Sequence, residues 1–391
     1  MKETKFKDTE IGKIPEDWEV TPIGKACNVR RGVRVTKEQL TDEGRYPVYQ
    51  NTNYPMGYFD NYNVDANTPF VIVGGSAGQI GLSKERYWAA DDCAYFEKSN
   101  TLNKVFLYYE LTHRQFEIKK FVRTASVPRL DRKVIESFVL PLPSLHEQHR
   151  IASALTSIDN LISSLDKLIE KKKNIKQGTM QQLLTGKTRL KGFSEPWVEK
   201  KLGDVAVNYT GLTYSPMNVK SYGTLVLRSS NIQKGILVFN DNVFVDMDIP
   251  SRAIAKKNDL LICVRNGSKA LIGKSAVITD YADGMAFGAF MTILHANDIQ
   301  QGFLNYLWQA DYIQQQVKDN MGATINQITN ADIEQFKIVV PHSLKEQQAI
   351  ATILTKMDNE ITALEAKKAK YEAIKQGMMQ QLLTGKIRLI S

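Results

Sequence analysis

The sequence of 391 residues contains no run of about 18 apolar residues, the length a helix needs to cross a membrane. Its N-terminus, MKETKFKDTEIG, lacks the apolar stretch of a secretory signal. Cysteine is scarce, with three residues in the chain: Cys27, Cys93 and Cys263. They are far apart and form no Cys-x-x-Cys or Cys/His cluster. This pattern argues against disulfides and structural zinc. We therefore expect a cytoplasmic protein without a membrane partner, whose cysteines lie in its core.

Catalytic motifs are also lacking, although three strings imitate one. Residues 186–188 (GKT) look like the end of a phosphate-binding loop, but Gln181 stands where that loop needs a glycine. Residues 67–70 (NTPF) resemble the Asn-Pro-Pro-Phe loop of adenine methyltransferases but lack one proline and any glycine-rich cofactor loop. His146 and His149 share a predicted helical turn, yet their counterparts in the repeat described below are not histidines. The sequence predicts a protein without catalytic or metal-binding residues of its own.

What the sequence does contain is a long internal repeat. Residues 147–190 and 346–389 align without a gap at an offset of 199, with 25 of 44 positions identical. The segments before them match as well: Trp18 aligns with Trp197, and Gly32 aligns with Gly211. The chain is therefore predicted to consist of two similar halves, each a globular segment followed by the repeated stretch.

Each repeated stretch is predicted to be one long helix. Ser144 and Ser343 stand at the expected N-caps, with a glutamate three residues later as in a capping box. Gly186 and Gly385 stand where helices commonly end. Between these limits, apolar residues alternate by three and four positions as in a heptad seam. The seam residues are Ile151, Leu155, Ile158, Ile162, Leu165 and Ile169, and then Ile350, Leu354, Met357, Ile361 and Leu364.

The two helices are expected to pack against each other. About 40 residues at 1.5 Å each give roughly 60 Å, which is too long for one stripe to be buried on a compact domain. Two similar halves favour a pseudo-twofold arrangement, so the helices should be antiparallel. The predicted fold class is mixed α/β: two α+β domains separated by two long antiparallel helices that form a coiled coil, with an internal pseudo-twofold repeat. The predicted boundaries are 1–144 and 191–343 for the domains, and 145–190 and 344–391 for the helices.

Within the domains, short apolar runs predict strands at Thr68–Val73 and Leu260–Val264. Residues 103–120 show a loosely helical pattern, and Gly302–Val317 is predicted to be one amphipathic helix.

Charge and loop composition point to nucleic acid. The net charge is +9, and the excess lies mainly in residues 145–191 and 344–391, so we expect partners to hold part of any bound DNA. Arginine suits phosphates and the guanine edge, and asparagine or glutamine suits adenine. In the first half, the candidate DNA contacts are Arg30, Arg31, Arg34, Gln50, Asn51, Asn53, Tyr54, Ser76, Arg123, Ser126, Arg129 and Arg132. In the second half, they are Tyr209, Tyr214, Arg228, Ser229, Asn231, Arg265, Asn266, Lys269, Thr324, Asn326 and Gln327.

Three motifs carry a resemblance to a known family. The chain opens with Ile14-Pro15-x-x-Trp18, and each half ends in a proline-containing turn before Glu-Gln-x-x-Ile-Ala. Each helix then closes on Ile-Lys-Gln-Gly-x-Met-Gln-x-Leu-Leu-Thr-Gly-Lys. Over nearly its whole length the chain resembles the specificity (S) subunit of type I restriction-modification systems. The second half departs from the pattern by lacking the isoleucine before Trp197.

The resemblance implies a division of labour between subunits. Each domain would be a target recognition domain reading one half of a bipartite double-stranded DNA sequence, while the helices set the spacer and dock methyltransferase (modification) subunits, two in number. Methylation and ATP-driven cleavage would belong to those modification subunits and to restriction subunits. S-adenosylmethionine, ATP and Mg²⁺ would therefore be bound by the partners, with no cofactor in this chain.

Two other functions remain open from the sequence. The chain could be a non-catalytic coiled-coil adaptor whose domains bind protein, in which case a complex with modification subunits would show no preference among duplexes. It could also be a single-chain methyltransferase or nuclease, which would modify or cut DNA alone.

Overall fold

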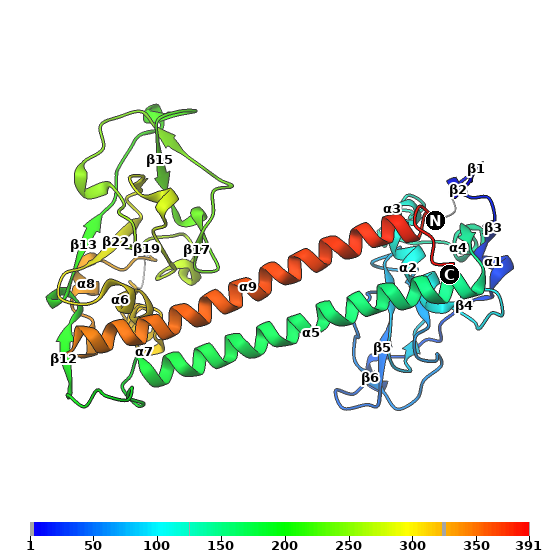
Figure 1. The fold of residues 1–391 in the computed structure, drawn as a ribbon, viewed down its shortest axis with the longest axis horizontal. Helices are drawn as coiled ribbons and strands as arrows, with labels where there is room; N and C mark the ends of the chain where they lie inside the picture. The colour runs from blue at the N-terminus through cyan, green and yellow to red at the C-terminus, as the bar shows by residue number, and fades with distance from the viewer. Residues whose placement is uncertain (1–3, 125, 323–325, 391) are drawn as a thin grey trace. The chain divides into compact units, whose positions relative to one another are not determined.

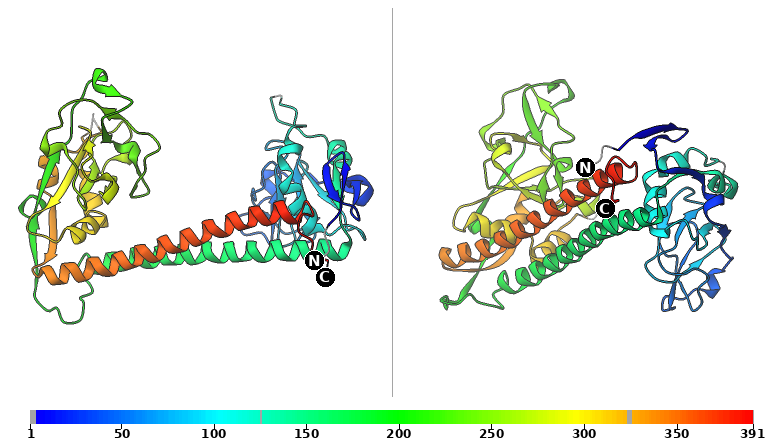
Figure 2. Two further views of the ribbon diagram at one scale, coloured as in Figure 1. Left: turned by 45° about the horizontal axis from the view of Figure 1, so that its top comes forward. Right: turned by 45° about the vertical axis from the view of Figure 1, so that its right-hand side comes forward.

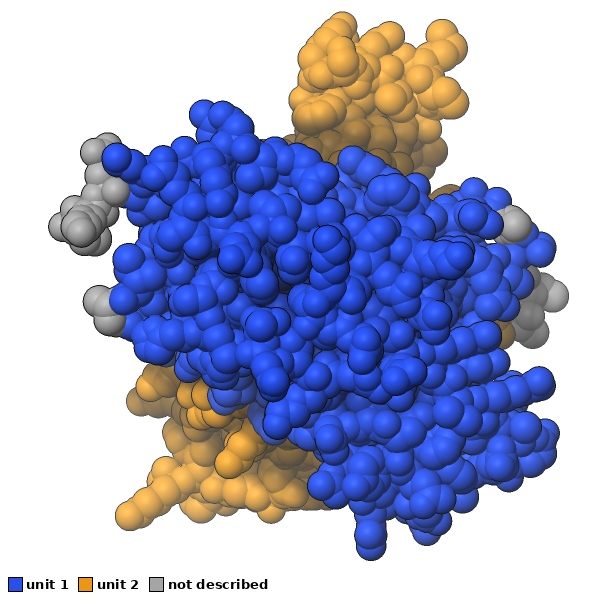
Figure 3. All heavy atoms as spheres, turned by 90° about the vertical axis from the view of Figure 1, so that its right-hand side faces the viewer, with its two compact units in different colours: residues 1–167, 365–391 blue, residues 168–364 orange. Residues whose placement is uncertain are grey.

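The computed structural model describes residues 4–124, 126–322 and 326–390 (Figure 1). The chain divides into two compact units, one of residues 1–167 with 365–391 and one of residues 168–364 (Figure 3). Two long helices, α5 (Leu145–Leu183) and α9 (Leu344–Leu382), contribute residues to both units. Each unit therefore combines one globular domain with parts of both long helices.

The first domain is built on an antiparallel sheet with the strand order β4-β10-β7-β8. These strands are β4 (Val29–Arg31), β10 (Cys93–Phe96), β7 (Pro69–Ile72) and β8 (Ile80–Leu82). A second sheet contains β6 (Tyr58–Phe59), β5 (Tyr46–Tyr49) and β9 (Trp88–Ala89), with β5 parallel to β9. The shorter pairs are β1 (Phe6–Thr9) with β2 (Gly12–Pro15), and β3 (Glu19–Pro22) with β11 (Val139–Leu142). The helices are α1 (Ile23–Ala26), α2 (Lys104–His113), α3 (Gln115–Lys119) and α4 (Arg132–Ser137).

The second domain repeats this plan. Its main antiparallel sheet has the order β13-β22-β19-β20, from β13 (Ala206–Thr210), β22 (Met291–Ala296), β19 (Leu260–Cys263) and β20 (Ser275–Val277). The second sheet has β14 (Val219–Lys220), β18 (Phe244–Val245), β15 (Thr224–Leu227) and β21 (Ala286–Phe287), with β15 parallel to β21. β12 (Trp197–Lys201) pairs with β23 (Lys337–Pro341), and a hairpin is formed by β16 (Ile232–Gln233) and β17 (Ile236–Leu237). The helices are α6 (Gln301–Leu307), α7 (Asp311–Asp319) and α8 (Asn330–Glu334).

The predicted strands at Thr68–Val73 and Leu260–Val264 are confirmed as β7 and β19, which lie inside their sheets and are buried on both faces. The prediction of a single helix at Gly302–Val317 is wrong, because the helix is interrupted between α6 and α7. Trp308 lies at the break, buried, and its Nε1 donates to Gly273 O at 2.9 Å. Tertiary packing of one aromatic side chain thus overrides the helical pattern.

The glycine shared by both domains marks a close approach of two backbone segments. A Cβ placed on Gly32 would lie 2.1 Å from Ala90 O, and one placed on Gly211 would lie 2.1 Å from Gly288 O. Neither contact leaves room for any side chain. The glycine is therefore repeated for a packing reason. The end of β4 lies against the end of β9 in the first domain, and the end of β13 lies against the end of β21 in the second.

The long helices run antiparallel within each unit, as predicted (Figure 2). In the first unit, the Lys375–Asp159 pair measures 2.7 Å and the Lys368–Asp166 pair 2.6 Å. In the second unit, the Lys176–Asp358 and Lys172–Glu360 pairs each measure 2.6 Å. Within each unit, the residue number along one helix rises as the number of its partner on the other helix falls. Lys368 aligns with the seam residue Ile169 of the first repeat. Its ion pair with Asp166 therefore takes the place of an apolar seam contact.

The predicted seam lies inside this packing. Ile151, Leu155, Ile350 and Leu354 are buried, and the remaining seam residues are at least half-buried. At about 1.5 to 3 kcal/mol for each fully buried aliphatic side chain, the seam is a principal source of helix stability.

The helix ends match the prediction in part. Gly186 and Gly385 adopt the left-handed conformation, with φ of 69° and 68°, as expected after a helix end. Ser144 Oγ accepts a hydrogen bond from Glu147 N at 3.3 Å, which is one half of a capping box. The other half of the predicted capping box, a hydrogen bond from Ser144 N to the Glu147 side chain, is wrong. The Glu147 carboxylate instead accepts hydrogen bonds from Trp18 and Arg388. No helix in residues 4–124, 126–322 or 326–390 has both the length and the apolar character that a membrane span requires.

Candidate nucleic-acid interface

Three loops of the first domain meet beside the ends of β5 and β7. Gly75 N donates to Pro128 O at 3.1 Å, and Ser76 N donates to Asn51 O at 3.0 Å. These bonds tie the segment before α4 and the loop after β5 to the loop after β7. We call residues 50–54, 74–78, 123–124 and 126–129 the first loop cluster. It contains predicted DNA contacts from distant parts of the sequence: Gln50, Asn51, Asn53, Tyr54, Ser76, Arg123, Ser126 and Arg129.

Arginines at this cluster are held in place but remain reachable. Arg129 Nη1 lies 2.9 Å from Asp92 Oδ1, and Arg31 Nε donates to Asp91 O at 2.7 Å. Their side chains are still 57% and 59% exposed. Exposed ion pairs contribute only about 0 to 1 kcal/mol, so a phosphate or a guanine edge can replace the aspartate at small cost.

The second domain builds a matching cluster. Ile328 N donates to Val264 O at 2.9 Å, as Leu130 N donates to Val73 O at 2.9 Å in the first domain. Asn266 Nδ2 donates to Ser229 Oγ at 3.0 Å. We call residues 228–229, 265–269 and 326–327 the second loop cluster. The segment before α4 or α8 is thus joined to the loop after β7 or β19 by the same backbone bond in both domains.

The sequence did not identify Phe290, whose side chain lies beside this cluster. The Arg265 guanidinium lies 5.0 Å from the ring centre of Phe290, which is 55% exposed. Phe290 holds the place between β21 and β22 that Asp92 holds between β9 and β10. An exposed aromatic ring beside an arginine offers a stacking surface for a base. The only sequence signal was a phenylalanine in a short turn before a strand.

Several predicted residues have other roles or lie apart. Arg30 lies on the opposite face of β4 from Arg31, and its ion pair with Glu97 (2.7 Å) raises the pKa of Arg30. Arg132 pairs with Glu136 within α4 at 3.0 Å. Arg34 and Lys269 are exposed and have no side-chain partner among the described residues. Thr324 lies outside the described residues.

In the second domain, Asn231 corrects the prediction. It is fully buried, and its Nδ2 donates to Val238 O at 3.0 Å while its Oδ1 accepts from Arg228 N at 2.9 Å. Its side chain holds the loop after β15 together, so we leave it out of the interface. Arg228 pairs with Asp241 at 2.9 Å. Tyr209, Tyr214 and Gln327 are half-buried, with both tyrosines packed against core clusters.

The residues repeated between the halves serve a different purpose from the loop clusters. Glu147, 1% exposed, accepts hydrogen bonds from Arg388 Nε (2.7 Å) and from Trp18 Nε1 (3.1 Å). Glu346 accepts the same pair of bonds from Arg189 (2.8 Å) and Trp197 (3.4 Å). We call each set a joint, because it ties one domain to one long helix and to the segment that follows the other. The hydrogen bonds that Arg388 donates to Glu147 and Asp17 raise the pKa of Arg388.

A second repeated contact lies beside each joint. Tyr109 Oη donates to Asp159 Oδ2 at 2.7 Å, and Asp159 also pairs with Lys375. In the second unit, Tyr306 Oη donates to Asp358 Oδ2 at 2.8 Å, and Asp358 pairs with Lys176. Each cluster joins a domain helix, α2 or α6, to both long helices at once.

Among the described residues, neither the histidines nor the acidic residues form a metal site. No group of three or more His, Cys, Asp or Glu side chains that could hold a metal occurs in the described part of the chain. His149 Nδ1 lies 2.6 Å from Leu145 O on the surface of α5. Cys27, Cys93 and Cys263 are buried free thiols, and burial raises the pKa of Cys27 to about 11.

Comparison with known proteins agrees with this architecture. The profile of the family described as Type I restriction modification DNA specificity domain matches residues 15–177 and 194–376. The specificity subunit of the type I restriction enzyme MjaVIII from Methanocaldococcus jannaschii is 28% identical over 418 residues, covering 99% of this chain and 97% of that protein. The EcoKI specificity subunit of Escherichia coli K12 is 30% identical over 190 residues, covering 46% of this chain and 40% of that subunit.

Solved structures share the fold. The crystal structure of the type I restriction-modification S subunit from M. genitalium superposes with a TM-score of 0.68 at 20% identity, covering 93% of this chain and 96% of that chain. A chain from a study of complex assembly and conformational transition in the type I system gives a TM-score of 0.57 at 16% identity, with 96% and 99% covered. Members of the specificity-subunit family carry no cofactor themselves. The chain therefore belongs to the DNA specificity subunits of type I restriction-modification systems, as a non-catalytic component of such a system.

Proposed function

We propose that each globular domain reads one half of a bipartite double-stranded DNA target, with target recognition domains at residues 1–144 and 191–343. The two loop clusters support this proposal most strongly, because each gathers three separate loops and the same backbone bond joins two of those loops in both domains. Each cluster presents arginine and amide side chains of the kinds that read base edges and hold phosphates. Two equivalent surfaces on one chain suit two half-sites.

The helix segments, residues 145–190 and 344–391, are the proposed spacer and docking surface for two modification subunits. Restriction subunits join that complex, and S-adenosylmethionine, ATP and Mg²⁺ act within these partners. The assembly works in the cytoplasm, with the DNA that it reads. The positive charge excess of the helix segments supports a role next to DNA held by several subunits.

Affinity and specificity come from different contacts in this proposal. Phosphate contacts by exposed arginines and lysines supply affinity that falls with salt, while base-edge contacts select the sequence. The half-sites lie about one turn of B-DNA apart, roughly 34 Å or 10 base pairs between centres. The bases between them are not read.

The proposal is tested by mapping methylated adenines in cells that carry this chain and its cognate modification subunit. The expected result is one bipartite motif with a spacer of fixed length. Methylation without sequence preference would support a protein-binding adaptor instead. Methylation or cleavage by the chain alone would show a catalytic protein.

A further inference from the structure

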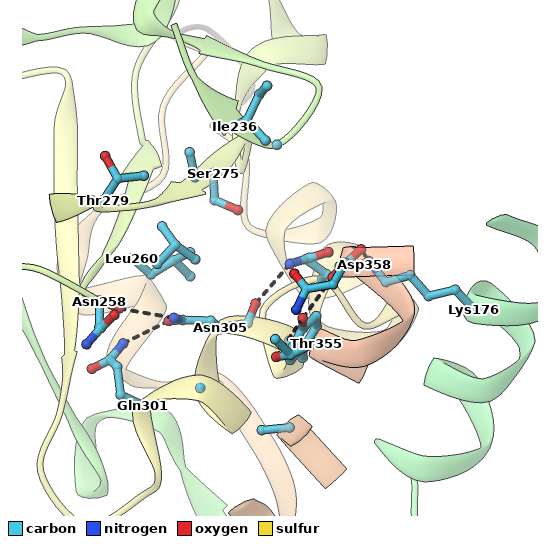
Figure 4. A pocket seen from close by; sticks show the side chains of 18 of the residues that line it. Lys176, Ile236, Asn258, Leu260, Ser275, Thr279, Gln301, Asn305, Thr355 and Asp358 are labelled. Atoms are coloured by element: carbon cyan, nitrogen blue, oxygen red, sulfur yellow. Dashed lines mark hydrogen bonds and ion pairs between the residues drawn. The ribbon is translucent and has the colours of Figure 1, made fainter. Parts of the chain in front are cut away.

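The second unit contains a groove of about 1150 Å³ whose lining residues all belong to that unit (Figure 4). Its walls are the tip of the β16–β17 hairpin, the strand β20, the helix α6 and the first half of α9. Half of the lining residues carry amide or hydroxyl side chains, including Gln301, Asn305, Thr355 and Asn359. This surface offers hydrogen bonds beside its apolar parts.

The equivalent place in the first unit is bridged. There Lys84 Nζ donates to Asn160 Oδ1 at 2.9 Å, joining the end of β8 to α5. Asn160 corresponds to Asn359 in the helix repeat, whose offset is 199. Both Thr279 and Asn359 line the groove, and no bond joins them.

The strand register identifies Thr279 as the counterpart of Lys84. Asn67 N donates to Ser83 O at 2.8 Å just before Lys84, and Asn258 N donates to Ile278 O at 2.9 Å just before Thr279. Replacing lysine by threonine at this position shortens the side chain and leaves the groove unbridged.

One wall of the groove is a free sheet edge. β20 is the last strand in the order β13-β22-β19-β20, so one side of its backbone has no strand partner. In an antiparallel pair, alternate residues turn their N–H and C=O groups toward that free side. Ser275 and Val277 line the groove. An extended polypeptide can pair with such an edge and add a strand.

The charge of the groove indicates which polypeptide fits. Four lysines line it, Lys176, Lys234, Lys274 and Lys356, against the single acidic residue Asp358, which already pairs with Lys176. Lys234 and Gly235 form the two-residue turn of the β16–β17 hairpin, with φ of 51° and 79°, which holds Lys234 at the hairpin tip. The groove therefore carries an excess of positive charge.

We propose that this groove binds one extended, acidic segment of a partner polypeptide, which pairs with β20 and places its carboxylates near Lys234 and Lys356. The inference rests on the proposed function only in that the chain works within a protein complex. A polypeptide fits better than DNA because the backbone edge supplies main-chain hydrogen bonds and because no arginine lines the groove. Since Lys84 bridges the equivalent place, the occupant binds once per chain.

The test uses the full chain and a fluorescein-labelled peptide of alternating glutamate and threonine, with an alternating lysine and threonine peptide as control. The acidic peptide is expected to bind saturably in fluorescence anisotropy, and the basic peptide is not. Thr279→Lys places an amine opposite Asn359, as in the first unit, and should weaken peptide binding about tenfold or more. Lys234→Glu should weaken it through charge without closing the groove. Lys220→Glu makes the same charge change on β14, outside the groove, and is the control that should leave peptide binding unchanged.

Unaltered peptide binding in both Thr279→Lys and Lys234→Glu would overturn the proposal, as would equal displacement of the peptide by unrelated duplex DNA. In the purified complex with modification subunits, a photo-crosslinking residue at position 279 should label a protein segment rich in Asp and Glu. Labelling of DNA alone would assign the lysines to phosphate binding. Failure of the groove is separable from failure of the proposed function, because Thr279→Lys should leave the methylated bases unchanged.

Discussion

Arg388 and Glu147 form a two-bonded ion pair within the first unit, 241 residues apart in the sequence, with distances of 2.7 and 2.8 Å. The side chains are 9% and 1% exposed. Removing one partner of a buried pair costs about 3 to 5 kcal/mol, because the remaining charge stays buried. We therefore expect Arg388→Ala to lower the free energy of unfolding by about this amount, measured by urea denaturation.

The matched control for this pair is Asp17→Ala. Asp17 also accepts hydrogen bonds from Arg388, which lower the pKa of Asp17, but its side chain is largely exposed. Its loss should change stability by no more than about 1 kcal/mol. An equal effect of the two substitutions would show that burial does not set the strength of the joint.

Substitutions in one loop cluster should alter one half-site. Arg129→Ala is expected to weaken selection at a position of the first half-site by about 1 to 3 kcal/mol and to leave the second half-site intact. Arg265→Ala should do the reverse. Adenine-methylation mapping with cognate modification subunits reads both halves together. Arg86→Ala is the control, since Arg86 is exposed but lies outside both clusters; a change in both half-sites from either cluster variant would contradict separate reading.

The Tyr109–Asp159–Lys375 cluster should affect spacing instead of bases. Tyr109→Phe removes the hydrogen bond to Asp159 that links α2 to the helix pair, at a cost of about 1 kcal/mol. We expect a broader range of tolerated spacer lengths in a duplex library, with the same bases read. Asp166→Asn, which breaks only the helix-to-helix pair with Lys368, is the control. Insertion of four residues after Ile162, about one helical turn, should shift the preferred spacer; altered bases at an unchanged spacing would contradict this role.

Glu110 should make stability depend on pH. It is fully buried in α2, its Oε2 has no hydrogen-bond partner among the described residues, and burial raises its pKa from 4.5 to about 8. Between these values, the folded state keeps a proton that the unfolded state releases, so stability falls as pH rises from 4.5 to 8. Glu110→Gln should remove this slope and stabilise the protein by about a few kcal/mol above pH 8.

Denaturation at several pH values measures that slope. Glu117→Gln is the control, because Glu117 is half exposed and its hydrogen bond from Arg114 lowers its pKa. The equivalent of Glu110 in the second domain is Leu307, as expected for a position inside a core. A parallel pH profile of Glu110→Gln and the unaltered protein would show that Glu110 is not the titrating group.

A fragment of residues 1–190 should form a dimer that recognises a palindromic version of the first half-site. It contains Arg189, which can occupy on a second copy the place that Arg388 holds opposite Glu147. Trp18 and Asp159 are present as well, so both contacts of the joint region can form in the dimer. Sedimentation of the fragment should show a dimer, and the Glu147→Ala fragment should dimerise more weakly. A strictly monomeric fragment would contradict the antiparallel pairing.

The sequence predicted those features that arise from periodicity. The helices and the buried strands β7 and β19 follow from apolar spacing, which the core then satisfies. The antiparallel pairing follows from the internal repeat, because two similar halves favour a pseudo-twofold arrangement. The joints did not follow, because a glutamate three residues after a serine also suits a capping box, and only tertiary contacts with Trp18 and Arg388 decide between the roles. The break before α7 lies at the buried Trp308, whose indole donates to Gly273 O, and this contact has no sequence pattern.

The candidate interface shows the same limit. Residue type identified polar loops, and the fold brings many of them into two clusters. Residue type did not separate Asn231, which is buried, from Asn266, which is half-buried at the second cluster. It also passed over Phe290, because an aromatic residue in a turn is normally assigned to the core.

The bridge between Lys84 and Asn160 exists in one half of the chain, and its absence in the other gives the molecule a polarity. Two identical partner subunits bound to the two halves would meet different surfaces, one bridged and one open. Their environments would differ even on DNA whose half-sites had the same sequence. The complex would thus retain a distinguishable first and second side, which a perfectly duplicated chain would lack.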